Sequence, residues 1–173
     1  MVKERKRAVS PPALYPLLFA PVYKQYVWGG NRIARKFHRT IPHDTCAESW
    51  EIADRPDGMS IVTNGHLAGK SLQFLVQAYG RKLLGRHART AAFPLLIKIL
   101  DAQQRLSLQV HPNEKSAHTT GGEPKTEMWY VLDAKRGSSV FSGLRRGTDQ
   151  TKLLAALRNH VVEPLLCRIP IKT

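Results

Sequence analysis

The sequence has few cysteines, few acidic residues and no long apolar run, and each shortage argues against a class of protein. Its two cysteines, Cys46 and Cys167, lie far apart and form no CxxC pattern. This argues against a disulfide scaffold or a cysteine-based zinc site, and predicts a reducing, cytoplasmic location. The near-apolar run Phe93–Leu100 is too short to span a bilayer and contains a lysine. The basic N-terminus has no apolar segment of the kind found in signal peptides. We therefore expect a soluble protein of one domain with no membrane partner.

The sequence has 13 Asp and Glu residues and 27 Lys and Arg residues, which gives a net charge of +14. Such an excess attracts anions. The basic residues gather in three clusters, at Lys3–Arg7, Arg32–Arg39 and Arg81–Arg89. Nucleic-acid-binding proteins usually interleave aromatic side chains with such clusters, and this sequence does not. We interpret the charge as a solvated basic surface that favours anionic substrates. Nucleic-acid binding remains the less favoured alternative.

Short apolar segments separated by turn residues predict a mainly β fold with two helices. Residues 1–12 form a basic tail that ends at Pro11 and Pro12, and we expect it to be flexible. Ser71 and Thr148 are predicted N-caps of the two helices, Leu72–Leu84 and Asp149–Asn159. The predicted strands are Ser60–Thr63, Phe93–Leu100, Leu106–His111, Thr126–Leu132, Ser138–Leu144 and Glu163–Ile169.

The alternating strand Leu106–His111 carries the most informative polar residues. Because side chains two apart on a strand point the same way, Ser107, Gln109 and His111 share a face opposite Val110. Glu127 lies at the polar start of the strand Thr126–Leu132. An amide oxygen, an imidazole nitrogen and a carboxylate oxygen would together suit zinc, or manganese, cobalt or nickel in its place. A surface His beside a Pro is the alternative for His111.

Lys98 interrupts an apolar run, and two interpretations stay open for it. Its ammonium either reaches the surface along an apolar stem or points into a pocket.

Six segments in order resemble the type I phosphomannose isomerases, also called mannose-6-phosphate isomerases. They are Trp28-Gly29-Gly30, Ala47–Ile52, Ala68–Leu72, Phe93–Ala102, Leu106–Pro112 and Lys125–Tyr130, which read WGG, AESWEI, AGKSL, FPLLIKILDA, LSLQVHP and KTEMWY. The most specific is LSLQVHP, which is similar to the family signature LSxQVHP. The resemblance runs over residues 14–173.

The resemblance implies a cupin, a jelly-roll-like β-barrel, that binds one zinc ion and interconverts mannose 6-phosphate and fructose 6-phosphate. It implies that Gln109, His111 and Glu127 are three of four zinc ligands. Ser107 and Lys98 match positions that line the sugar-phosphate pocket, and Lys125 matches a position assigned to proton transfer. The family's fourth ligand, a histidine, and a later catalytic arginine come after the part that these residues match. We therefore expect residues 13–173 to be the N-terminal part of such a domain, with the second half of the barrel missing.

Two alternatives to an active isomerase stay open. The first is a non-catalytic remnant of the family, and the second is a basic nucleic-acid-binding protein. For the remaining polar and aromatic residues we expect structural roles. These are Glu48 and Glu51 as surface or supporting carboxylates, Trp28, Trp50 and Trp129 as core residues, and His87, His118 and His160 as exposed side chains.

Overall fold

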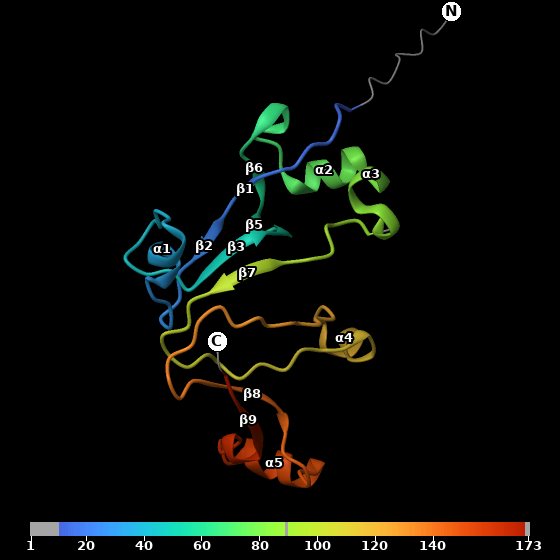
Figure 1. Ribbon diagram of the computed structural model, residues 1–173. Coiled ribbons are helices and arrows are strands. Elements are labelled where there is room, and N and C mark those ends of the chain that lie inside the picture. The colour runs from blue at the N-terminus through green and yellow to red at the C-terminus, as the bar shows by residue number, and fades with distance from the viewer. Residues whose placement is uncertain (1–10, 89, 172–173) are drawn as a thin grey trace, which may run out of the picture. The chain divides into compact units, whose positions relative to one another are not determined.

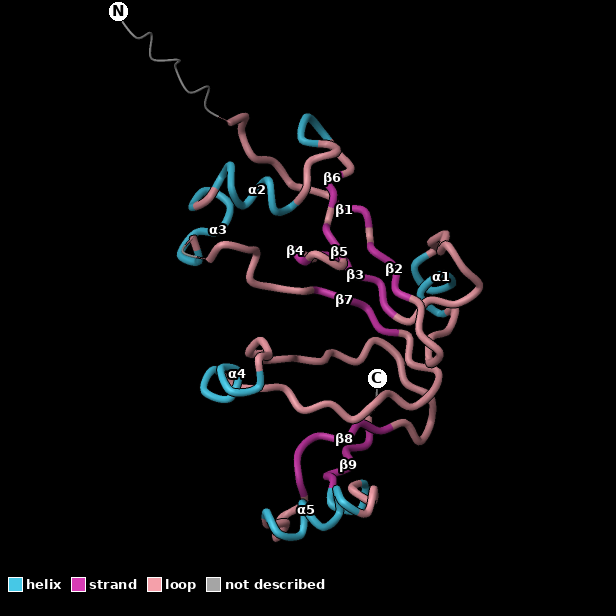
Figure 2. The backbone as a smooth tube through the Cα atoms, turned by 180° about the vertical axis from the view of Figure 1, so that it is seen from behind, coloured by secondary structure: helices cyan, strands magenta, loops and turns pink. Residues whose placement is uncertain are grey.

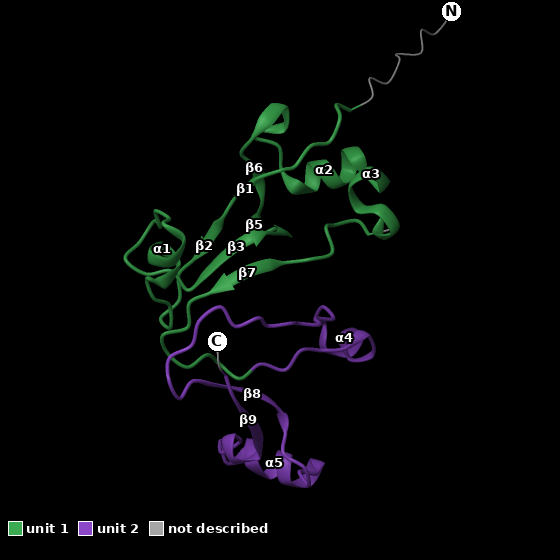
Figure 3. Ribbon diagram, in the orientation of Figure 1, with its two compact units in different colours: residues 1–108 green, residues 109–173 purple. Residues whose placement is uncertain are grey.

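The computed structural model describes residues 11–88 and 90–171 of the chain (Figure 1). They divide into two compact units, residues 1–108 and residues 109–173, which are coloured separately in Figure 3. Most of the predicted tail, residues 1–10, lies outside the described residues, and the two prolines that follow have no regular structure. Each unit is described below by itself.

The first unit is built on a three-stranded antiparallel sheet in the order β2-β3-β7 (Figure 2). Its strands are β2 (Val22–Lys24), β3 (Glu48–Ile52) and β7 (Ile97–Leu100). Two shorter antiparallel pairs accompany it. They join β1 (Phe19–Ala20) to β6 (Ile61–Val62), and β4 (Asp54–Arg55) to β5 (Gly58–Met59). The central strand β3 contains the AESWEI segment, so its side chains project from both faces of the sheet.

Three α-helices belong to this unit: α1 (Arg32–Phe37), α2 (Leu72–Tyr79) and α3 (Arg81–Leu84). Two 3₁₀ turns, η1 (Gly65–Leu67) and η2 (Gly85–His87), complete it. The predicted cap is confirmed, since the Ser71 side chain accepts a hydrogen bond from the Phe74 amide. The single helix predicted over Leu72–Leu84 is wrong, because Gly80 adopts φ 46° and divides it.

Apolar packing in the first unit lies between α2 and the β-strands around it. Val62, Leu67, Leu75 and Tyr79 form one buried cluster, against which residues of the chain before β1 pack. Leu72, Val76 and Leu84 form another, beside Ile52 and Phe93. The buried positions on α2 recur at three- and four-residue spacing, as expected for a helix with one apolar face.

The second unit contains one antiparallel strand pair and two helices. The pair is β8 (Ser139–Leu144) with β9 (Leu166–Pro170), and the helices are α4 (Glu114–Thr120) and α5 (Gln150–Arg158). A 3₁₀ turn, η3 (Glu163–Leu165), occupies the start of the strand predicted over Glu163–Ile169. The N-cap of α5 is Asp149 rather than the predicted Thr148, because the Asp149 carboxylate accepts the Lys152 amide hydrogen bond.

The sequence-based fold needs three corrections within the described residues. They contain five α-helices rather than two, since α1, the break at Gly80 and α4 were not predicted. They contain four small sheets and no closed barrel. The segments Leu106–His111 and Thr126–Leu132 are not strands, because neither has a hydrogen-bonded ladder partner. Their apolar side chains are correspondingly open, with Val110 91% and Tyr130 80% exposed.

No helix among the described residues is long and apolar enough to cross a membrane.

Candidate active site

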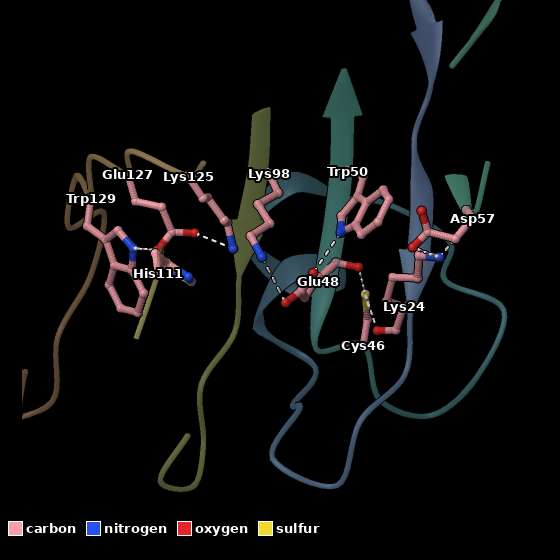
Figure 4. A network of polar contacts seen from close by, with 10 residues as sticks. All are labelled: Lys24, Cys46, Glu48, Trp50, Asp57, Lys98, His111, Lys125, Glu127 and Trp129. Carbon is pink, nitrogen blue, oxygen red and sulfur yellow. Dashed lines mark hydrogen bonds and ion pairs between the residues drawn. The ribbon is translucent and has the colours of Figure 1, made fainter. Parts of the chain in front are cut away.

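Two of the three predicted metal ligands meet in the second unit. His111 Nε2 lies 3.0 Å from Glu127 Oε2, and both side chains are partly buried (Figure 4). Lys125 Nζ lies 2.8 Å from the other oxygen, Glu127 Oε1. Trp129 Nε1 donates a longer bond of 3.4 Å to Glu127 Oε2. The carboxylate of Glu127 is therefore the centre of this cluster.

Local hydrogen bonds around α4 bring these residues together. Asn113 and Ser116 form a capping box, in which Asn113 Oδ1 accepts the Ser116 amide and Ser116 Oγ accepts the Asn113 amide. The Lys125 amide donates to the Pro112 carbonyl at 3.2 Å. That bond closes the loop around α4 and places the residues before the helix beside those after it. His111 and Glu127 meet although neither lies on a regular strand.

The electrostatics of the cluster favour an ionised Glu127. Burial alone would raise the pKa of this carboxyl group. The hydrogen bonds from Lys125 and His111, the charge of Lys125 and the bond from Trp129 outweigh burial and lower the pKa to about 2. Glu127 is therefore a carboxylate at neutral pH, which is the form that binds metal ions.

The predicted donor set fits a zinc ion in its chemistry. Gln109 lies two residues before His111 in the same irregular segment and is exposed. An imidazole, a carboxylate and an amide oxygen are all acceptable zinc donors. The 3.0 Å between His111 Nε2 and Glu127 Oε2 is close to the roughly 3.3 Å separating two ligands of a tetrahedral ion with bonds of about 2 Å. No group of three or more His, Cys, Asp or Glu that could hold a metal is found among the described residues.

The two residues predicted to line the sugar-phosphate pocket belong to the first unit. Ser107 is exposed in the irregular segment that precedes Gln109. Lys98 lies on β7, and its Nζ is 3.1 Å from Glu48 Oε1. Neither of the two alternatives for Lys98 described this partner, because a contact between residues 50 apart leaves no local signal in the sequence.

Two further residues near these clusters compare differently with their expected roles. Of the two expectations for Glu48, the surface position is wrong, because Glu48 is buried, with Trp50 Nε1 donating to its Oε2 at 2.6 Å. The spacing of Glu48 and Trp50, two apart on one strand, was the available signal. Trp129 was expected in the core, but it is mostly exposed and donates to Glu127. Trp50 is buried as predicted, and His87, His118 and His160 are exposed as predicted.

Comparisons with known proteins agree on one family. Residues 17–124 match the catalytic domain of type I phosphomannose isomerases. The mannose-6-phosphate isomerase ManA of Bacillus subtilis is 38% identical over 159 residues, which cover 91% of this chain and 49% of that protein. The mannose-6-phosphate isomerase of Streptococcus mutans is also 38% identical, over 162 residues, 91% of this chain and 49% of its own length.

A solved structure shows the same likeness in three dimensions. The crystal structure of the mannose 6-phosphate isomerase from Bacillus subtilis superposes with a TM-score of 0.81 at 34% identity. The superposition covers 91% of this chain and 50% of that one. The chain thus spans about half the length of the relatives that it matches. Within that span it belongs to the type I phosphomannose isomerase family.

Proposed function

We propose that this chain carries part of a zinc-dependent isomerase site that interconverts mannose 6-phosphate and fructose 6-phosphate. The observation that carries the proposal is the cluster in which Glu127 faces both His111 and Lys125, at 3.0 Å and 2.8 Å. This cluster joins the motif LSLQVHP, which precedes α4 in the sequence, to the motif KTEMWY, which follows it. The relatives named above are mannose-6-phosphate isomerases, which supports the choice of substrate.

In this proposal Gln109, His111 and Glu127 hold the metal. A zinc ion bound there would supply Lewis-acid stabilisation of the oxyanion that develops on the open-chain sugar. The other roles belong to the chain's own side chains. Before metal binds, the ionised Glu127 holds His111 close through one oxygen and the Lys125 ammonium through the other.

Aldose–ketose isomerisation needs a group that moves a proton between C1 and C2 of the substrate. We assign Lys125 a part in this transfer, as a group whose ammonium can donate a proton, because its Nζ is held beside a predicted ligand and its side chain stays partly exposed. Lys98 and Ser107 would bind the phosphate by charge and by a hydroxyl hydrogen bond. The N-terminal part of a cupin barrel, residues 13–173, is the fold we propose to carry them.

The test has two readouts on the 173-residue chain. The first is zinc affinity by calorimetry, which we expect to fall more than about tenfold in His111→Ala and in Gln109→Ala. The matched control is His118→Ala, since His118 is an exposed histidine on α4. Equal zinc affinity in all three variants would refute the metal site.

The second readout is a coupled assay of mannose 6-phosphate conversion with and without added zinc. Zinc-dependent turnover that is lost in Lys125→Met would support the complete proposal. Zinc binding without turnover would instead support the second candidate, a non-catalytic member of the family.

A further inference from the structure

One face of the central sheet carries three polar or amphipathic side chains in contact. Glu48 and Trp50 are two apart on β3, so they project from the same face. Lys98 is the register partner of Trp50 on β7, which places it on that face and diagonal to Glu48. Figure 4 shows the three side chains turned toward one another above the strands.

Both oxygens of Glu48 are engaged. Oε2 accepts the Trp50 indole hydrogen at 2.6 Å, and Oε1 lies 3.1 Å from Lys98 Nζ. Glu48 is 8% exposed, and the side chain of Lys98 is 22% exposed. The Lys98 ammonium therefore has a nearly buried, fixed counter-charge on one side and some access to solvent.

Trp50 is itself held in place from the other edge of the sheet. Lys24 Nζ lies 4.3 Å from the centre of the Trp50 ring and also pairs with Asp57. A Cβ atom on Gly58 would lie 2.6 Å from two ring carbons, so β5 packs tightly against the indole. Contacts from Lys24 on β2 and Gly58 on β5 thus fix the direction of the Trp50 indole N–H. The N–H in turn orients the Glu48 carboxylate that accepts its hydrogen bond.

An ion pair buried to this degree is an ineffective way to stabilise a sheet. Removing both charges from water costs about as much as their attraction returns, and apolar residues often serve equally well. What such a pair does achieve is to fix the end of a lysine side chain, which otherwise moves freely on a four-carbon stem. The arrangement therefore points to a use for a fixed ammonium.

We propose that Glu48, oriented by Trp50, is a positioning residue that holds the Lys98 ammonium ready to bind the phosphate group of the substrate. The inference rests on the proposed function for the role of Lys98 and adds two residues to it. Because one Glu48 oxygen faces Lys98 and the other accepts the Trp50 indole hydrogen, we assign Glu48 to act through Lys98. It serves binding and not proton transfer.

The same strand supplies a matched control on its opposite face. Glu51 accepts two hydrogen bonds from Arg39, at 2.6 and 3.0 Å, and a third from Ser49 at 2.6 Å. It is an acidic residue of the same motif in a partly buried ion pair, with its side chain 24% exposed against 10% for Glu48, and that pair is with Arg39. Glu51→Gln thus reports what the loss of a structural ion pair does to the sheet.

The first experiment records ¹⁵N spectra of the lysine ammonium groups in the 173-residue chain. We expect one ammonium signal that exchanges slowly with water and disappears in Lys98→Arg. In Glu48→Gln its exchange is at least about tenfold faster, because the charged partner is lost. Glu51→Gln leaves it unchanged. Equal exchange in the wild type and Glu48→Gln would overturn the proposal.

The second experiment titrates the zinc-loaded chain with mannose 6-phosphate. The dissociation constant is expected to rise about tenfold in Glu48→Gln and about threefold in Trp50→Phe, which keeps an aromatic ring but loses the N–H. It stays within about twofold in Glu51→Gln. Equal weakening in Glu48→Gln and Glu51→Gln would show a merely structural role and refute the positioning role.

If Glu48→Gln does not fold, Trp50→Phe still tests whether the contacts from Trp50 through Glu48 fix the Lys98 ammonium. Unchanged ammonium exchange in Trp50→Phe would then refute the proposed chain of contacts. If the wild type binds no mannose 6-phosphate, the proposed function and the phosphate role both fail. The ammonium signal still decides separately whether Glu48 fixes Lys98.

Discussion

In the first unit, Glu48 and Lys98 form their ion pair across neighbouring strands of a sheet. In the second unit, His111 and Glu127 meet between two segments that have no regular structure. The backbone hydrogen bonds between β3 and β7 fix the geometry of the first pair. The second pair depends on a few hydrogen bonds around α4. The comparison teaches that two polar clusters in one chain can be held by very different numbers of backbone hydrogen bonds. Each prediction below changes one unit and uses the other as its reference.

The largest expected effect comes from truncating the core of the first unit. Leu75 is fully buried in the cluster with Val62, Leu67 and Tyr79, so Leu75→Ala should lower the free energy of unfolding by about 3 kcal/mol. Val110→Ala in the second unit removes an exposed side chain and should change it by less than about 0.5 kcal/mol. Urea denaturation followed by circular dichroism measures both. Similar losses in the two variants would mean that Val110 is covered in solution.

The next effect comes from adding a methyl group where the first unit is tightly packed. A Cβ on Gly30 would meet the side chain of Gln103 and lie 2.7 Å from Asp101 Oδ2. Asp101 is buried and accepts the Arg32 amide at 2.6 Å, so it cannot yield freely. We expect Gly30→Ala to cost about 2 kcal/mol of unfolding free energy.

The control for that substitution lies in the second unit. A Cβ on Gly122 would come within 3.2 Å of Pro112 at the nearest, so Gly122→Ala should cost well under about 1 kcal/mol. Thermal unfolding of the two variants side by side makes the comparison. A larger loss in Gly122→Ala would show that the second unit is the more tightly packed of the two.

A smaller effect on stability is expected from the cap of α4, but it should also change binding at the proposed metal site. Asn113→Ala removes the side-chain oxygen that accepts the Lys115 and Ser116 amides, and should cost about 1 kcal/mol. Because α4 separates His111 from Glu127, zinc affinity should fall several-fold as well. The control is Ser71→Ala, which removes the cap of α2 in the first unit and should leave zinc affinity unchanged. Calorimetric zinc titrations measure both variants. Equal zinc affinity in Asn113→Ala and Ser71→Ala would show that the cap of α4 does not support zinc binding.

The smallest perturbation uses the two cysteines, one in each unit, as probes. Cys46 is buried and Cys167 is partly exposed. Burial is the main cause that raises the pKa of the Cys46 thiol, so its thiolate is scarce in the folded state. A disulfide reagent should therefore modify Cys167 at least about tenfold faster than Cys46 at pH 8. Cys46→Ser and Cys167→Ser identify the two phases, and equal rates would mean that the first unit opens readily.

The raised pKa of Cys46 also has a consequence for stability. The folded state keeps the thiol proton at a pH where the unfolded chain has lost it. The contribution of Cys46 to stability is therefore full below the ordinary thiol pKa of about 8.5 and is lost as the pH rises above it. Stability measured from pH 7 to pH 10 should fall less in Cys46→Ala than in the wild type.

The sequence predicted the local features of the fold better than the pairing of distant segments. The cap at Ser71, the end of α3 at Gly85 and strand β8 were predicted because side chains a few residues apart determine them. Helix α4 was missed, because a run such as Glu114–Thr120 has no apolar face to detect. The segment around Gln109 alternates and the one around Met128 is an apolar run, but neither pattern can supply the neighbouring strand that a ladder needs.

For the candidate site, the sequence supplied the residue types and the structure supplied their partners. His111 and Glu127 were predicted to act together and do lie in contact, whereas Gln109, Ser107, Lys98 and Lys125 keep their predicted roles as proposals. The contact between Glu48 and Lys98 was not predicted. Its two residues lie 50 positions apart, and the register of β3 and β7 that joins them is a property of the folded sheet.

The loop around α4 has a consequence for the order in which the site can form. His111 and Glu127 are separated by 16 residues, and Glu48 and Lys98 by 50. Closing the longer loop costs about 1 kcal/mol more chain entropy than closing the shorter one. The shorter loop also carries its own capping box and the Lys125–Pro112 bond. The pair of His111 and Glu127 is thus a local contact that can assemble early during folding, whereas the contact between Glu48 and Lys98 must wait for the sheet.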